Sequence, residues 1–221
     1  MTGSLRHYSP VDRLLSVIDQ GLRSSLGPPG AVSATGRASP AAACPTSTPA
    51  PGSAAARHSA GLMRVNHAGE IAAQALYHGQ ALVAREPAVQ EFLLAAAREE
   101  GDHLNWCRAR QTALGSRPSL LDPLWYAGSA AIGALAGLAG DRISLGFITE
   151  TERQVEGHID DHLARLPAED GASRAVLLQM QRDEVAHAEH ATERGAVELP
   201  APVRGLMRLT AKLMTTSAYW L

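Results

Sequence analysis

The chain has 221 residues, 45% of them hydrophobic, which is enough to bury the core of one ordinary domain and still carry an appendage. Its formal net charge is −2, so there is no global basic field, and nucleic acid is not an expected partner. Aromatic residues make up only 4%, so the core must consist mainly of Ala, Leu, Val and Ile, a composition that favours helices. Cys44 and Cys107 are too few for a disulfide framework, and we expect reduced thiols in a cytosolic compartment.

The N-terminal part of the chain, before the folded domain, has two segments of different composition. Residues 1–27 contain an amphipathic pattern over Pro10–Leu26, with apolar residues at helical spacing, and no apolar stretch typical of a secretory signal. Residues 28–60 consist mainly of Ala, Pro, Ser, Thr and Gly and contain no acidic residue. Such a segment buries too little surface to offset its ordering entropy, so we predict a disordered linker.

Residues 61–221 are predicted to form the folded domain. Helical periodicity continues between proline and glycine stops, and no segment shows sustained alternation with a period of two, so the predicted class is all-α. The predicted amphipathic helices are Leu62–Arg85, Ala88–Leu114, Ile143–Leu166, Ala172–Ala196 and, shorter, Val203–Tyr219.

Two Glu-x-x-His pairs lie on the second and fourth of these helices. Glu100 with His103, and Glu184 with His187, are each three residues apart, so each pair lies on one helix face and can hold a metal ion. One such pair is a weak signal, because surface helices carry them by chance. The alternative interpretation is therefore solvated surface charges with incidental histidines.

A further glutamate on a small or apolar helix face precedes each pair by one helix. Glu70 precedes Glu100, and Glu152 precedes Glu184, at nearly the same separation along the chain. This repeated module supplies the ligand inventory of a ferritin-like four-helix bundle with a carboxylate-bridged di-iron site. Oxygen-rich ligation suits Fe or Mn, and two divalent cations would neutralise four buried carboxylates. The predicted ligands, which are also the predicted catalytic residues, are Glu70, Glu100, His103, Glu152, Glu184 and His187. We expect His78, His162, Glu99 and Glu156 to be solvated, and His190 to be exposed or to lie just outside the ligands.

The segment Leu62–Gln80, LMRVNHAGEIAAQALYHGQ, resembles the demethoxyubiquinone hydroxylase family of ubiquinone biosynthesis. The family signature, Arg-Val-(Asn/Asp)-His-x-Gly-Glu followed by an aromatic residue, stands at 64–70 with Tyr77. The resemblance continues through both Glu-x-x-His pairs and covers residues 61–221. One departure is Ile159 after His158, where some relatives have tyrosine.

The resemblance implies a di-iron monooxygenase of the 3-demethoxyubiquinol 3-hydroxylase type, with the same six iron ligands. It implies O₂ and a polyprenyl quinol as substrates, and an external reductant of unknown identity, since no Rossmann fingerprint is present. It also implies peripheral association with the cytoplasmic side of the bacterial cell membrane, with other ubiquinone-biosynthesis proteins as further candidate partners. The alternatives are another ferritin-like di-iron oxidase, an iron-sequestering protein and a non-catalytic membrane scaffold. Rubrerythrin is excluded, because two cysteines cannot form its Cys₄ centre.

Two additional helices bear on membrane association. Pro123–Gly140 contains no charged residue and fits a membrane-dipping or substrate-gating element, an ordinary buried helix or a true span. Val203–Leu221 carries three basic residues and no acid, and fits either a bilayer surface or a helix that caps the bundle. Finally, a disordered linker predicts that deleting Pro28–Ala56 leaves iron binding unchanged.

Overall fold

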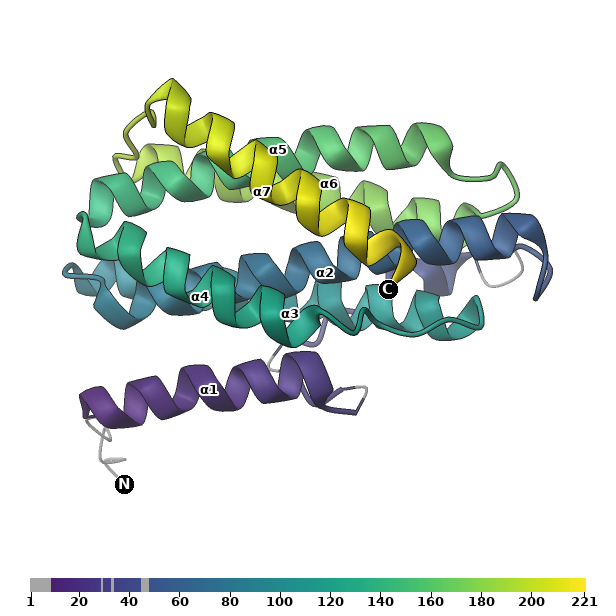
Figure 1. The fold of residues 1–221 in the computed structure, drawn as a ribbon, viewed down its shortest axis with the longest axis horizontal. Helices are drawn as coiled ribbons and strands as arrows, with labels where there is room; N and C mark the ends of the chain where they lie inside the picture. Colours follow the sequence, from purple (N-terminus) through teal and green to yellow (C-terminus); the bar gives the residue numbers. More distant parts are fainter. Residues whose placement is uncertain (1–8, 29, 33, 45–47) are drawn as a thin grey trace.

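The computed structural model describes residues 9–28, 30–32, 34–44 and 48–221. These residues form seven α-helices and one short 3₁₀ helix, with no strand among them, which confirms the all-α prediction for this part of the chain (Figure 1). The elements are α1 (Pro10–Leu26), η1 (Pro40–Ala43), α2 (Ala54–Val83), α3 (Pro87–Ala113), α4 (Asp122–Leu138), α5 (Asp141–Arg165), α6 (Gly171–Glu193) and α7 (Ala201–Trp220).

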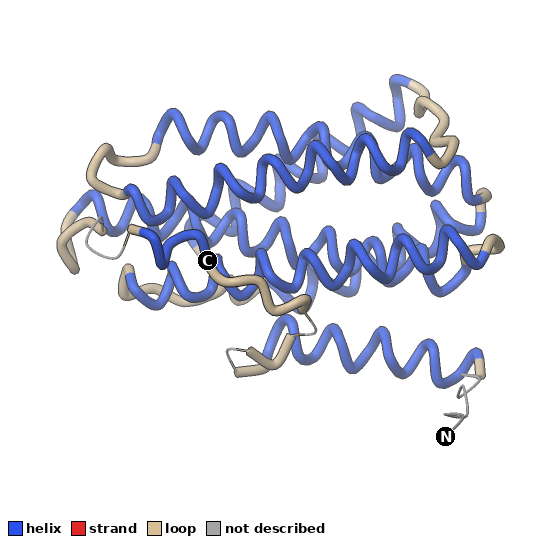
Figure 2. The backbone as a smooth tube through the Cα atoms, turned by 180° about the vertical axis from the view of Figure 1, so that it is seen from behind, coloured by secondary structure: helices blue, strands red, loops and turns tan. Residues whose placement is uncertain are grey.

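The bundle consists of two helical hairpins, α2 with α3 and α5 with α6, packed side by side (Figures 1 and 2). Helix α4 connects the hairpins and packs along α2, while α7 crosses the bundle against α2 and α5, and α1 lies outside it against α2 and α4. The core is largely aliphatic, as the composition predicted. Its largest fully buried aliphatic side chains include Leu62, Ile71, Leu93, Leu104, Leu145, Ile148, Ile159 and Leu177. The structure is thus the predicted ferritin-like helical bundle with additional helices.

The start of α2 differs from the sequence prediction. The Ser53 hydroxyl accepts a hydrogen bond from the backbone N–H of Ala56 and caps the helix, which begins at Ala54. Ala56 and Ala60 are buried in the core, so residues 54–60 belong to the bundle, and the linker prediction is wrong for them. Val32 is also buried, because it packs on a core formed by other segments. The composition of a segment indicates only how much apolar surface the segment can bury on its own, and not whether it packs on a core formed by other segments.

Helices α2 and α4 approach each other closely at two glycines. A Cβ atom at Gly79 would lie 2.0 Å from the backbone oxygen of Ala130, and one at Gly133 would lie 2.2 Å from the backbone oxygen of Leu76. Both residues are therefore required for the close packing of these two helices. The opposite side of α4 is open: Leu124, Leu135 and Leu138 are exposed, so α4 is not a fully buried helix.

The described part of the chain contains no helix with enough length and apolar character to cross a membrane. The interpretation of 123–140 as a true span is therefore not supported. Helix α7 is tied to the bundle at its end, where Ala218 is buried and the backbone oxygen of Tyr219 accepts a hydrogen bond of 2.8 Å from Arg64. Its Leu206, Leu209 and Leu213 nevertheless remain more than 60% exposed.

Candidate metal centre

The six side chains predicted as ligands meet inside the bundle. Helix α2 contributes Glu70 and α5 contributes Glu152, while α3 and α6 contribute the two Glu-x-x-His pairs. None of the six is more than 3% exposed. Residues three apart lie on the same helix face, so a helix that points one member of the pair into the bundle also points the other inward.

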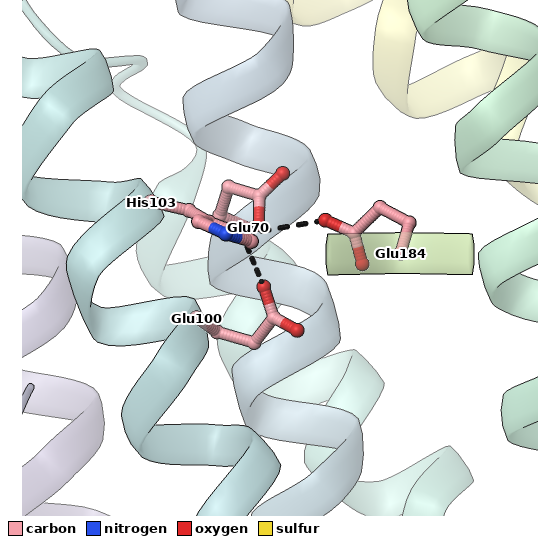
Figure 3. A group of neighbouring side chains, drawn as sticks. All are labelled: Glu70, Glu100, His103 and Glu184. Atoms are coloured by element: carbon pink, nitrogen blue, oxygen red, sulfur yellow. Dashed lines mark hydrogen bonds and ion pairs between the residues drawn. The ribbon is translucent and has the colours of Figure 1, made fainter. Parts of the chain in front are cut away.

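The donor atoms form two overlapping groups, each with one atom per residue and all atoms within 4.8 Å of one another. Figure 3 shows the first group converging on His103. Glu100 and Glu184 belong to both groups, so each can place one oxygen on either side. The first group is Glu70, Glu100, His103 and Glu184, and the second is Glu100, Glu152, Glu184 and His187.

Both histidines turn Nδ1 toward the carboxylates. His103 Nδ1 lies 3.0 Å from Glu100 Oε2, 3.2 Å from Glu70 Oε2 and 3.3 Å from Glu184 Oε1. His187 Nδ1 lies 3.2 Å from Glu100 Oε1 and 3.4 Å from Glu184 Oε2. Nδ1 is therefore the nitrogen that each histidine offers to a metal.

A pair of metal ions would bind buried polar atoms that are not satisfied by hydrogen bonds. Among the described residues, Glu152 Oε2 has no hydrogen-bond partner, and Glu100 Oε1, Glu184 Oε1 and His187 Nδ1 make only the longer ion-pair contacts given above, although all four atoms are buried. Buried polar atoms without partners are costly, and clustered carboxylates also repel one another. Two divalent cations would satisfy these atoms and offset the charge, and the oxygen-rich donor set suits Fe or Mn.

Two outer carboxylates hold the histidines in a crossed arrangement. Asp183 Oδ2 lies 2.9 Å from His103 Nε2, and Glu99 Oε2 lies 3.1 Å from His187 Nε2. Each acid directly precedes the glutamate of one Glu-x-x-His pair and contacts the histidine of the other pair. Such carboxylates orient metal-bound imidazoles. Glu99 is partly exposed and is not among the metal-binding groups, as expected, but it also contacts His187. The repeated acid before each pair is the sequence signal that could have indicated this contact.

Tyr77 is a further part of the centre that the sequence identified only as the aromatic residue of the signature. Its hydroxyl is fully buried and donates a hydrogen bond to Glu152 Oε1. Burial, together with the charge of Glu152, raises the pKa of Tyr77 well above its usual value. The tyrosine therefore stays protonated and fixes the orientation of this carboxylate.

Most of the remaining signature residues have structural roles. Arg64 donates hydrogen bonds to the backbone oxygens of Arg117 and Tyr219, and so joins α2 to the α3–α4 loop and the end of α7. Asn66 contacts His162 Nδ1 at 2.8 Å, and the buried His67 lies 3.1 Å from Asp122 Oδ2. The signature therefore combines one predicted metal ligand with contacts that place its helix.

Two histidines expected to be solvated are buried instead. His78 Nδ1 lies 2.9 Å from the Tyr126 hydroxyl, and burial lowers the pKa of His78 to about 4. Burial also lowers the pKa of His162 to about 3. Both imidazoles pack against neighbouring helices as neutral groups, a contact that periodicity on their own helix could not show. His190 is exposed, as one of the two expectations for it stated.

Without metal, the centre distributes its charge unevenly. Burial and then the charge of Glu100 raise the pKa of Glu70, and burial and then Glu184 raise that of Glu152. Burial opposes ionisation of Glu100 as well, but His103 and His187 hold the pKa of Glu100 well below its usual value. Burial works to lower the pKa of both histidines, yet their carboxylate neighbours raise it. The metal-free site thus retains protons that a metal would displace.

We expect the metal-free protein to lose stability as the pH rises from about 7 to about 8. Below about 6.5 the buried, neutral His78 and His162 act in the opposite direction, because the unfolded chain binds protons there that the folded chain does not. Above the ordinary glutamate pKa of 4.5, Glu70 and Glu152 bind more protons in the folded than in the unfolded chain, so rising pH favours unfolding. The stabilising charge of His103 and His187 is fully present below 6.5 and is lost as the pH rises through their raised pKa values. Glu100 has the opposite effect, but only below 4.5.

Denaturant unfolding at several pH values measures this effect, which amounts to about 1.4 kcal/mol for each unit by which a pKa is displaced. Protein loaded with Fe²⁺ is the control. Its stability should rise over the same range, because metal and protons compete for the same atoms. A metal-free protein that gains stability from pH 7 to 8 would contradict the charge distribution described above.

The helical bundle and the six buried donors are typical of ferritin-like proteins whose carboxylate-rich clusters bind a pair of metal ions. The chain belongs to the family described as ubiquinone biosynthesis protein COQ7, which matches residues 57–218. This confirms the resemblance found from the signature.

Several curated proteins called 3-demethoxyubiquinol 3-hydroxylase are similar to this chain. The protein from Cupriavidus necator is 54% identical over 209 residues, which is 95% of this chain and 99% of the relative. The protein from Xanthomonas oryzae pv. oryzae is 54% identical over 218 residues, covering 99% of this chain and 98% of the relative. The protein from Ralstonia pickettii is 60% identical over 163 residues, covering 74% and 75% respectively.

Proposed function

We propose that the chain is a monooxygenase of ubiquinone biosynthesis that hydroxylates a demethoxyubiquinol-type ring with O₂ at a pair of iron ions. The observation that carries the proposal is the buried donor set in which Glu100 and Glu184 belong to both metal groups. The substrate class follows from relatives named 3-demethoxyubiquinol 3-hydroxylase that match nearly the whole chain. An iron-sequestering protein or another di-iron oxidase would share the donor set but not this similarity.

The residues of the chain would have the following roles. Glu100 and Glu184 would contribute to holding both ions, while Glu70 with His103 and Glu152 with His187 would each contribute to holding one. Iron bound in this way supplies the redox chemistry that activates O₂. Asp183, Glu99 and Tyr77 orient ligands through the hydrogen bonds described above. The six donors are almost completely buried, so the protein keeps bulk water from the reacting atoms.

The structure contains an apolar groove, which favours a substrate with a lipid tail. It has a volume of about 470 Å³ and lies where α4, α5 and the start of α7 meet. Ile132 and Leu135 of α4, Phe147 of α5 and Val203 of α7 contribute to its walls. We propose that this groove receives part of the polyprenyl tail of the quinol, since its lining is almost entirely apolar.

We propose peripheral attachment to the cytoplasmic side of the bacterial cell membrane, by way of exposed apolar side chains on three helices. Helix α7 crosses the near side of the bundle in Figure 1, α4 lies on the same side, and α1 runs alongside. Exposed large apolar side chains are found on all three: Leu14, Leu15, Ile18 and Leu22 on α1, Leu124, Leu135 and Leu138 on α4, and Leu206, Leu209, Leu213 and Trp220 on α7. Large apolar surfaces of this kind are typical of membrane or partner contacts. Other ubiquinone-biosynthesis proteins are therefore further candidates for these surfaces.

Reversing the charges of Arg204, Arg208 and Lys212 on α7 is expected to weaken binding to anionic vesicles. Each basic residue near an anionic surface contributes about 1 kcal/mol. Arg204 is 2.7 Å from Glu198 and Arg208 is 3.8 Å from Glu150, so these pairs should reduce the effect of both arginines. Vesicle sedimentation at two salt concentrations measures the loss, which should be smaller at high salt. The control reverses the exposed Arg98, Arg153 and Arg182 on α3, α5 and α6. Equal loss in both variants would show that α7 is not the basic anchor.

Isotope labelling tests the proposed reaction. One oxygen atom of O₂ should enter the ring, while the other is reduced to water with two electrons from the reductant. Full-length protein loaded with iron and supplied with a reductant, ¹⁸O₂ and a short-tailed demethoxyquinol should therefore form product with one ¹⁸O atom, as mass spectrometry measures. A parallel reaction in H₂¹⁸O with unlabelled O₂ is the control and should give no label. Oxygen from water, without exchange of the product hydroxyl, would rule out the monooxygenase proposal. Iron oxidation without product would favour the alternative of iron sequestration.

A further inference from the structure

Residues 35–37, here called the strap, lie across α3 just outside the metal centre. The buried carboxylate of Asp102 accepts hydrogen bonds from the backbone N–H of Gly36 at 2.9 Å and of Arg37 at 3.2 Å, and from the hydroxyl of Thr35. Trp106 Nε1 donates to the backbone oxygen of Arg37 at 3.2 Å. These contacts come from successive turns of α3, so the backbone of the strap is held at several points.

The side chain of Arg37 connects two acidic groups on different helices. Its Nε donates to Asp102 Oδ2 of α3 at 3.2 Å, and its Nη2 donates to Asp183 Oδ2 of α6 at 2.9 Å. The guanidinium carbon lies 5.0 Å from the centre of the Trp106 ring. Charge-assisted hydrogen bonds and the aromatic contact together restrict the guanidinium to one orientation.

Asp183 is the group through which the strap reaches the metal centre. His103 turns Nδ1 toward the metal-binding carboxylates. Its Nε2, which lies 2.9 Å from Asp183 Oδ2, carries a proton both in the charged imidazole and when Nδ1 binds a metal. Asp183 Oδ2 therefore accepts from both His103 and Arg37. The 3.3 Å separation of Arg37 Nη2 from His103 Nε2 joins two donors and is not a hydrogen bond.

We propose that Arg37 is a positioning residue of the metal centre, which fixes Asp183 and through it the imidazole of His103. This inference rests on the proposed metal-binding function. Outer groups that orient a ligand typically change metal affinity by 10- to 100-fold. The strap lies within the segment whose composition predicted a disordered linker. Deleting residues 28–56 should therefore weaken metal binding, contrary to what the sequence suggested.

Cobalt binding by the full-length protein tests this role. Arg37→Ala should weaken Co²⁺ binding about tenfold and change the visible absorption of the bound Co²⁺, because the imidazole of His103 is no longer held in one orientation. Arg37→Lys should restore part of the affinity, since a lysine can pair with Asp183 but cannot also reach Asp102 in the same planar arrangement. The matched control is Arg23→Ala, which removes an exposed arginine that pairs with Asp19 on α1.

A double-mutant cycle separates positioning from a general effect on folding. In an Asp183→Asn background, the further change Arg37→Ala should have little additional effect on affinity, because the connecting carboxylate is already altered. An equal tenfold loss in both backgrounds would overturn the inference, as would wild-type affinity and an unchanged spectrum in Arg37→Ala. A wild-type protein that binds no metal at all would overturn the metal centre itself.

Discussion

Exchanging Glu184 for glutamine is expected to remove both metal ions from the protein and to abolish hydroxylation. Glu184 belongs to both donor groups, so a neutral amide in its place weakens the binding of both metal ions. Changes to outer groups already cost 10- to 100-fold in affinity or activity, and we expect the loss of a shared ligand to exceed about 100-fold. Iron content per chain and product formation should fall together.

Two comparisons distinguish ligand loss from misfolding. Glutamine has nearly the same shape as glutamate, so the metal-free variant should keep the fold of the metal-free wild type, although it loses the ion pairs of Glu184 with His103 and His187. Glu189→Gln changes an exposed residue of the same helix α6 and should leave iron content and activity unchanged. A Glu184→Gln protein with two iron ions and full activity would refute the shared-ligand assignment.

Placing a methyl group at Gly79 or Gly133 is expected to destabilise the protein strongly. The new Cβ atom would lie within 2.2 Å of a backbone oxygen on the facing helix, and backbone cannot move aside as a flexible side chain can. Overpacking of a core typically costs about 1–3 kcal/mol, and separation of α4 from α2 places this change at the upper end or beyond. Denaturant unfolding of Gly79→Ala and Gly133→Ala measures the cost.

The same helices contain matched control positions. Nothing lies within 4 Å of a Cβ atom built at Gly69 on α2 or at Gly128 on α4. Alanine is favoured over glycine in a helix interior by about 0.5–1 kcal/mol, so Gly69→Ala and Gly128→Ala should be neutral or stabilising. The opposite signs are the test: a loss of stability at Gly128 as large as at Gly133 would show that helix contact is not the cause.

The sequence alone determined the fold class and the six side chains that meet inside the bundle. A Glu-x-x-His pair is a local pattern, because three residues along a helix return to the same face whatever surrounds it. Each pair also needs a partner glutamate one helix away, so the spacing of Glu70 and Glu152 was informative before any helix was placed. The signature around Glu70 was sufficient to indicate the family. It did not show that Arg64 and Asn66 act by holding helices together.

Only the tertiary structure showed which outer groups contact the predicted ligands. Periodicity places Asp183 and Glu99 on their own helices but does not indicate that each reaches the histidine of the opposite pair, because this depends on how α3 and α6 are rotated against each other. The same holds for the buried His78 and His162, whose neighbours come from other helices. The strap shows the limit of composition most clearly: it has little apolar surface of its own, yet the carboxylate of Asp102 and the ring of Trp106 bind its backbone. A segment that cannot form a core can still be ordered by polar contacts with one, and only the folded bundle brings those contacts together.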